Sequence, residues 1–202
     1  MSNTGNSSNK ATTPSANNTT ITAVTYRATS ATLTVGSAFA TLNHPLYAIN
    51  LSGLNPPYVS GETLFDEYLA SRPTHDAGHA NLEFWSRNGE TETTFVFYLG
   101  QEPVTISGFA IWNVEDGSGT FQGTMRFGHQ ALTGPFDDAF TFTPDANVAG
   151  QDYPGQAFLL PTPVAANFVE LEMKECTAKW EAATYCALGE IVWRVDLENE
   201  NS

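Results

Sequence analysis

Residues 93–113 read TTFVFYLGQEPVTISGFAIWN, and this stretch decides the fold class. It contains two runs rich in β-branched and aromatic residues, 93–99 and 104–112, with Gly100 and Pro103 between them. Runs of this composition that are bounded by turn residues are typical of β-strands. The stretch therefore predicts two consecutive strands joined by a short turn.

Similar runs recur along the rest of the chain, whereas only residues 62–70 suggest a helix, and a short one. Many short strands with turn signals between them predict an all-β fold, an antiparallel β-sandwich of the jelly-roll type with about eight strands. In 168–174 we expect Phe168, Leu171 and Met173 to face inward, with a bulge between the first two. The predicted strands are 22–29, 31–35, 93–99, 104–112, 123–127, 139–143, 156–160, 168–174 and 188–195.

The composition divides the chain into three parts. Residues 1–20 are rich in Ser, Thr and Asn and have no large apolar side chain after Met1, so they predict a flexible arm, either a plain linker or a segment that orders against a partner. Residues 21–196 form the predicted sandwich domain, and 197–202 an acidic tail. The arm lacks the apolar stretch of a signal peptide, so we expect either a leader that was removed or another route of export.

The charge balance excludes several classes of partner. The net charge is −14, from 22 acidic and 8 basic side chains. Nucleic acids and anionic membranes are held by Lys and Arg, so neither is an expected partner. No apolar run approaches the roughly 18 residues that span a bilayer. An acidic surface of this kind instead suits cation binding.

The chain has two cysteines, Cys176 and Cys186, which flank the loop between the last two predicted strands. Two cysteines placed in this way favour a disulfide and an oxidising location, either extracellular or on the surface of a cell or particle. The alternative is a pair of ordinary thiols.

Three stretches carry a resemblance to a known family. Residues 95–113 resemble a strand that ends in a Leu-Gly turn and is followed by a strand running into Trp-Asn. Residues 166–173 (ANFVELEM) are similar to a strand usually written Ala-Arg-Tyr-Val-Arg-Leu, and 187–193 (ALGEIVW) to a closing Leu-Ser/Gly-Glu-Ile strand. The family is that of the discoidin-like, coagulation-factor type C domains of the galactose-binding jelly-roll superfamily. A weaker match at 48–68 resembles its opening loop, and the resemblance covers 47–195.

The resemblance implies a non-catalytic recognition module that binds glycans, lipids or proteins through loops at one end of a β-sandwich. It also implies a structural calcium ion near the opening loop. The chain departs from the family pattern at Asn167-Phe168, where relatives prefer Arg-Tyr.

Candidate calcium ligands are the oxygen-bearing side chains of Asn50 and Asp66 in the opening region and of Glu190 in the closing strand. Calcium prefers carboxylate and carbonyl oxygens. The alternative is that Glu190 accepts hydrogen bonds from loop amides without a metal, since a buried carboxylate must be paired in one of these ways.

A ligand-binding set is predicted around the segment Trp85-Ser-Arg-Asn. Aromatic rings stack on the C–H faces of sugars, and His, Arg and Asn supply directed hydrogen bonds, so His79, Trp85, Arg87 and Asn88 form the candidate site. Packing of Trp85 in the core is the alternative. A zinc site at His75 and His79 is disfavoured because Pro73 and Gly78 argue against a helix. The other loop aromatics are Tyr58, Phe121, Tyr153 and Trp180, whereas Trp112 and Trp193 are expected in the core.

No motif proposes an enzyme: the chain has no Gly-x-Ser-x-Gly elbow and no phosphate-binding glycine loop before a helix. The first functional hypothesis is therefore a recognition or adhesion module that binds a glycan or a cell-surface ligand with the help of calcium. The second is an assembly component of a surface layer, appendage or virion, in which the arm of residues 1–20 docks on a neighbouring subunit.

Overall fold

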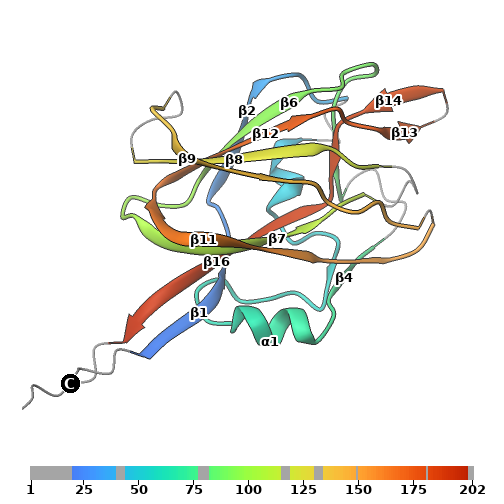
Figure 1. The fold of residues 1–202 in the computed structure, drawn as a ribbon. Helices are drawn as coiled ribbons and strands as arrows, with labels where there is room; N and C mark the ends of the chain where they lie inside the picture. The colour runs from blue at the N-terminus through green and yellow to red at the C-terminus, as the bar shows by residue number, and fades with distance from the viewer. Residues whose placement is uncertain are drawn as a thin grey trace, which may run out of the picture.

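The computed structural model describes residues 20–39, 44–76, 82–114, 119–129, 134–148, 150–180 and 182–199. Two antiparallel sheets face each other in these residues (Figure 1), which confirms the predicted β-sandwich. The first sheet has the strand order β1-β16-β7-β11 and the second β2-β6-β12-β8-β9. Their bounds are β1 Thr20–Tyr26, β2 Ser30–Val35, β6 Thr93–Tyr98, β7 Val104–Trp112, β8 Gln122–Gly128, β9 Asp137–Phe142, β11 Gln156–Ala166, β12 Phe168–Lys174 and β16 Glu190–Asn199.

Shorter elements surround the sandwich. A three-stranded sheet has the order β10-β4-β3, and two further pairs are β13-β14 and β15-β5. The predicted short helix is present as α1, and a 3-10 turn precedes it. Their bounds are η2 Pro45–Ala48, β3 Leu54–Asn55, α1 Phe65–Ala70, β4 Thr74–His75, β5 Phe84–Trp85, β10 Tyr153–Pro154, β13 Ala178–Trp180, β14 Ala183–Tyr185 and β15 Ala187–Leu188.

The main core lies between the two large sheets. Successive side chains of a strand point to opposite faces, so every second residue contributes to it. Phe97 and Phe109, from opposite sheets, both contact Trp193, with ring centroids 5.6 and 6.1 Å away, and all three rings are fully buried. Trp112 is also fully buried, so the prediction that Trp112 and Trp193 are core residues is confirmed.

The side chains of β12 correct one expectation. Val169, Leu171 and Met173 face the core and are fully buried, whereas Phe168 is only partly buried and packs against Tyr98 in a tilted arrangement with ring centroids 4.9 Å apart. β12 pairs with both of its neighbours without a register shift, so the bulge expected after Phe168 is absent. Every second side chain from Val169 onward is apolar and faces the core, so the strand keeps one register along its length.

A second, smaller core covers the outer face of the first sheet. α1 and the β10-β4-β3 sheet lie against this face (Figure 1). Phe65 and Tyr68 of α1 and Tyr153 of β10 pack around Trp112 of β7. The Trp112 indole N–H donates to the Pro73 carbonyl at 3.0 Å, so this buried ring is fixed by a directed contact as well as by packing.

The sandwich extends past its predicted ends. β1 begins at Thr20 and β16 continues to Asn199, three residues beyond the expected boundary at 196, because all of β1 pairs with the C-terminal part of β16, from Thr20 opposite Asn199 to Tyr26 opposite Trp193. Residues 1–19, which make up nearly all of the predicted arm, lie outside the described residues. Among the described residues, no helix has the length and apolar character to cross a membrane.

Candidate functional site

The segment that carries the predicted ligand-binding residues forms a short ladder with the chain that follows β2. Phe39 N donates to the Trp85 carbonyl at 2.9 Å, and Arg87 N donates to the Ser37 carbonyl at 2.7 Å. Ala38 and Ser86 form the bridge between these two bonds. Because side chains alternate along such a ladder, Phe39, Trp85 and Arg87 lie on the same side of it.

The turn after this ladder presents Arg87 and Asn88 to solvent, and both are exposed. Glu90 N donates to the Arg87 carbonyl at 3.1 Å and closes the turn. Gly89 has a φ of +83°, a backbone conformation that residues with a side chain rarely adopt. Its N–H donates to the Thr184 carbonyl at 2.9 Å. Both arms of the turn are therefore tied to neighbouring chain.

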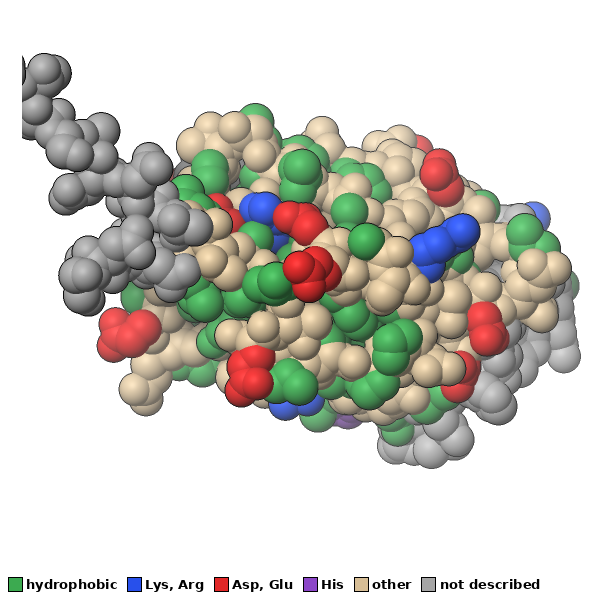
Figure 2. All heavy atoms as spheres, turned by 90° about the horizontal axis from the view of Figure 1, so that it is seen from below, with side chains coloured by type: hydrophobic (Ala, Val, Ile, Leu, Met, Phe, Trp, Pro, Cys, Tyr) green, Lys and Arg blue, Asp and Glu red, His purple; other side chains and the backbone are tan. Residues whose placement is uncertain are grey.

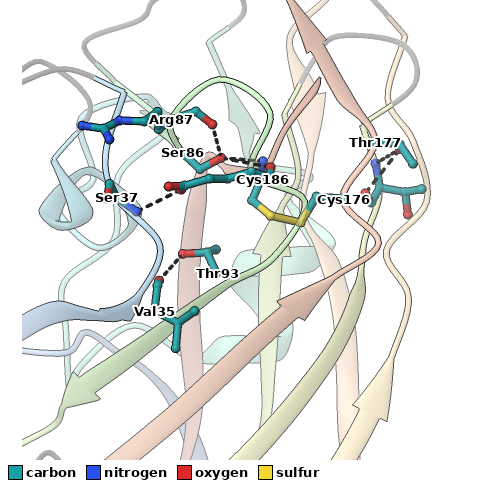
Figure 3. The surroundings of a disulfide bond; sticks show 10 residues. Val35, Ser37, Ser86, Arg87, Thr93, Cys176, Thr177 and Cys186 are labelled. Carbon is teal, nitrogen blue, oxygen red and sulfur yellow. Dashed lines mark hydrogen bonds between the residues drawn. A yellow bond between two sulfur atoms is a disulfide. The ribbon is translucent and has the colours of Figure 1, made fainter. Parts of the chain in front are cut away.

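A disulfide joins Cys176 and Cys186 beneath this turn, as predicted. Ser86 links the two structures, since its N–H donates to the Cys186 carbonyl at 2.8 Å and its hydroxyl accepts from Cys186 N at 2.8 Å. In Figure 3 the side chain of Arg87 extends away from the disulfide, while Ser86 points toward it. The backbone under the candidate site is thus cross-linked covalently and by hydrogen bonds.

Trp85 is a core residue in this structure, which corresponds to the alternative interpretation of this ring. Its side chain is 7% exposed and packs with Val114, Ala178 and Ala187. Tyr185 meets it edge-on, with ring centroids 5.7 Å apart. The ring face is covered, so Trp85 supports the site from below and does not present a stacking surface.

The exposed aromatic ring at this position is Phe39, which the sequence did not single out. Phe39 is 47% exposed, and its ring lies edge-on to Tyr185 at 5.7 Å between centroids. In sequence it is one more apolar residue after Gly36, a pattern shared with many buried aromatics. Only the pairing with Trp85 places it beside Arg87. We define the exposed residues Phe39, Arg87 and Asn88 as the disulfide-end surface; the buried ring of Tyr185 supports Phe39 from below.

The other aromatics that were expected in loops are mostly buried. Tyr58, Phe121 and Tyr153 are exposed by 5% or less, so none of them offers a ring face to a ligand. The side chain of Trp180 lies outside the described residues. His79 also lies outside them, so its place in the predicted set stays a prediction.

A buried polar network fixes Trp85 from the side of the second core. Its indole N–H donates to Glu83 Oε2 at 2.9 Å, and the Tyr153 hydroxyl donates to Glu83 Oε1 at 2.6 Å. The hydroxyl oxygen of Tyr153 is left to accept from His75 Nδ1 at 2.9 Å. Burial lowers the pKa of His75, because desolvation disfavours the imidazolium, so the ring is neutral near pH 7.

The three predicted calcium ligands are placed differently from one another. Glu190 is fully buried, and its Oε2 accepts from Leu51 N at 3.0 Å, so the loop-anchoring role expected of this carboxylate is present. Asn50 Oδ1 accepts from Ser52 N at 2.9 Å within the opening loop. Asp66 is 71% exposed, and its Oδ2 accepts from Arg194 at 3.2 Å. Asp66 therefore already has a cationic partner.

Glu190 is the one member of the set whose surroundings fit a cation. Its Oε1 is buried without a hydrogen-bond donor, and desolvation raises the pKa of the carboxyl group well above its ordinary value. Tyr58 and Tyr68 lie close enough that the Glu190 charge adds to burial in raising the pKa of both phenols. Among the described residues, His, Cys, Asp and Glu side chains do not gather in groups of three or more, so further ligands must be amide or backbone oxygens.

Comparison with known proteins identifies the fold. No protein-family model matches the sequence. A search of curated proteins also finds no match. Solved structures do match: truncated AlyQ, which has CBM32 and alginate lyase domains, aligns with a TM-score of 0.52 and 12% identity over 89% of this chain. The chain spans 34% of that longer protein.

A second solved structure matches along nearly its whole length. CBM32-1, from a family 31 glycoside hydrolase of Clostridium perfringens, aligns with a TM-score of 0.50 and 12% identity over 83% of this chain and 96% of that one. Likeness at this level of identity establishes the fold alone. The chain therefore has the same β-sandwich fold as these CBM32-containing structures.

Proposed function

We propose that the chain is a non-catalytic glycan-binding module whose ligand contacts the disulfide-end surface. The observation that carries this proposal is the half-exposed ring of Phe39 on the same side of the ladder as the exposed side chain of Arg87, with exposed Asn88 in the turn that follows. An aromatic ring next to amide and guanidinium donors provides the two kinds of contact that a sugar needs, a C–H face and directed hydrogen bonds. The likeness of the fold to the structures that contain CBM32 carbohydrate-binding modules supports this assignment.

Rigidity of the surface supports the same proposal. The disulfide, the Ser86 contacts and the Glu83 network hold the backbone of the ladder before any ligand arrives. Preorganised sites lose less conformational entropy on binding, so weak individual contacts with a sugar produce more net affinity. A placement outside the cell or on its surface is consistent with the disulfide.

The test is a glycan array probed with the wild-type chain in calcium and in chelator, followed by titration of each hit. Phe39→Ala and Arg87→Ala should each weaken binding by about tenfold, the equivalent of about 1.4 kcal/mol. Leu159→Ala and Arg72→Ala are matched controls, because both side chains are exposed and lie outside the surface. Equal loss in the controls, or no glycan bound in either condition, would contradict the proposal.

We also propose that calcium assists this module through the opening loop. Glu190 would hold the ion with Oε1, and Asn50 and neighbouring backbone carbonyls would complete its oxygen ligands. The ion would neutralise the buried carboxylate and stiffen the loop around Leu51, whose backbone has a φ of +65°. Asp66 is not included among these ligands, because its carboxylate already forms a salt bridge with Arg194.

A further inference from the structure

A groove of about 580 Å³ opens at the end of the sandwich opposite the disulfide. It lies between the edge strands β9 and β11, whereas β13 and β14 mark the other end of the molecule (Figure 1). Its floor is apolar and consists of Phe127, Phe140 and Val164, which come from both sheets. We call this hollow the open-edge groove. A smaller lobe of about 250 Å³ continues it and shares Phe127, His129 and Val164 with it.

The groove exists because both edges of the sandwich are irregular at the same place. On one side β11 leaves β7 between Leu159 and Val164, so the intervening residues have no partner on β7. Two of these residues, Pro161 and Pro163, lack an N–H and cannot donate to another strand. This edge therefore does not favour an added β-strand, and the natural occupant is a small molecule and not an extended peptide.

On the opposite side, β9 pairs with β8 with a register shift between Met125 and Phe127. Gly128 lies against the following turn, where an added Cβ would come within 2.8 Å of the Pro135 carbonyl oxygen. A glycine is required for this close approach. The side chain of Phe140 on β9 is only partly buried and lines the groove.

The chemistry of the lining selects a class of ligand. Polar residues also line the hollow: His129 and Thr162 line the groove, and His129 and Asp137 line the smaller lobe. Pro161 and Pro163 add carbonyl oxygens without matching N–H groups. A ring with one C–H face and several hydroxyl donors matches this arrangement, and the volume lies in the range of about 300–1,000 Å³ that is usual for small-ligand sites.

The charge of the groove lining narrows the class of ligand further. Neither Lys nor Arg occurs among the residues that line the two lobes, whereas Asp137 contributes a carboxylate. The chain as a whole carries a net charge of −14. An acidic sugar would meet repulsion and no Lys or Arg partner here. We propose that the open-edge groove is a second, separate binding site for an uncharged saccharide of one or two rings. It uses no residue of the disulfide-end surface, so it stands independently of the function proposed above.

The experiment is an NMR titration of the full chain with a panel of neutral disaccharides, lactose and cellobiose among them, and with a disaccharide that contains a uronic acid. The variant Ala139→Trp fills the groove from an exposed position of β9. Ala157→Trp is the matched control, because Ala157 is exposed on β11 outside the groove. Arg87→Ala removes a contact of the disulfide-end surface and leaves the groove intact.

We expect neutral sugars to shift the amide signals of Gly128, His129 and Thr162 in the wild type and in Arg87→Ala. Ala139→Trp should weaken this binding by about tenfold while Ala157→Trp does not. Shifts confined to Arg87 and its neighbours would overturn the groove site and leave the proposed function standing. The groove site is also overturned if no panel sugar shifts these amides, or if the uronate binds there more tightly than neutral sugars.

Discussion

Glu190 is the residue whose environment differs most from that expected of an ordinary acidic side chain. It is a fully buried carboxyl group with one oxygen bonded to Leu51 N and the other without a donor. Such a group is stable only when it is protonated or when a cation replaces the missing hydrogen bonds. The same side chain therefore anchors the opening loop, and it is the group through which the proposed calcium ion would act.

Replacing Glu190 with Gln tests whether the folded protein holds this carboxyl group protonated and whether it binds calcium through it. The ordinary pKa is 4.5, and burial raises the folded value. Below pH 4.5 the carboxyl group is protonated in both states. As pH rises above 4.5, the unfolded chain releases its proton while folded Glu190 keeps it, so the wild type loses about 1.4 kcal/mol of stability per pH unit until the folded pKa is reached. Glu190→Gln lacks this loss.

The measurement is urea unfolding of both proteins between pH 4 and pH 8, first in chelator and then in calcium. In chelator, the difference in the free energy of unfolding should grow with pH in favour of the variant. Calcium should raise the stability of the wild type alone. A parallel pH dependence of the two proteins, or an equal response to calcium, would show that Glu190 has neither property.

At the scale of elements, the disulfide end is built from short pieces that do not hold themselves together. β5, β13, β14 and β15 have two or three residues each. Strands of this length are marginal alone, so their positions depend on what joins them. The Cys176–Cys186 bond closes the loop that contains β13 and β14, and Ser86 connects that loop to the turn of Arg87.

The double variant Cys176→Ser/Cys186→Ser should therefore be less stable than the wild type by about 2–3 kcal/mol, from the entropy of closing a loop with a sequence separation of 10. Chemical denaturation under native redox conditions measures this loss. Glycan affinity at the disulfide-end surface should fall as well, while binding in the open-edge groove at the other end stays unchanged. Equal effects at both ends would indicate global unfolding and not a local role for the bond.

The strand boundaries show where the sequence alone was sufficient to predict an element. The predicted strands 104–112 and 168–174 match β7 and β12 residue for residue, because their composition and their burial in the sheet act in the same direction. β5 and β10 were not predicted. They have two residues each and exist through pairing with β15 and β4, which are distant in sequence.

At the scale of the whole molecule, the dominant property is negative charge. Acidic side chains are spread over the face that carries α1 and are not gathered in one patch (Figure 2). The net charge of −14 therefore acts as a general repulsion toward polyanions, and Arg87 modifies it locally at the disulfide-end surface.

Salt should then affect the binding of a polyanionic glycan but leave the binding of a neutral glycan almost unchanged. Raising the ionic strength from about 50 mM to about 500 mM shortens the screening length severalfold and weakens the repulsion, so binding of heparin, a polysulfated glycan, should strengthen from a low value. The affinity for a neutral glycan should change by less than about twofold. Calorimetric titration at the two ionic strengths measures both. Heparin binding that weakens with salt would reveal a local basic site that overcomes the net charge.

The sequence by itself determined the fold class, the main strands and the disulfide pair. These follow from composition, period and spacing, all of which are local. It also marked Glu190, Arg87 and Asn88. Only the tertiary structure decided that Trp85 is covered while Phe39 is exposed, because exposure of an aromatic ring depends on which distant segments pair beside it. The open-edge groove is likewise invisible in sequence, since irregularities in β9 and β11 combine only after the two sheets have packed.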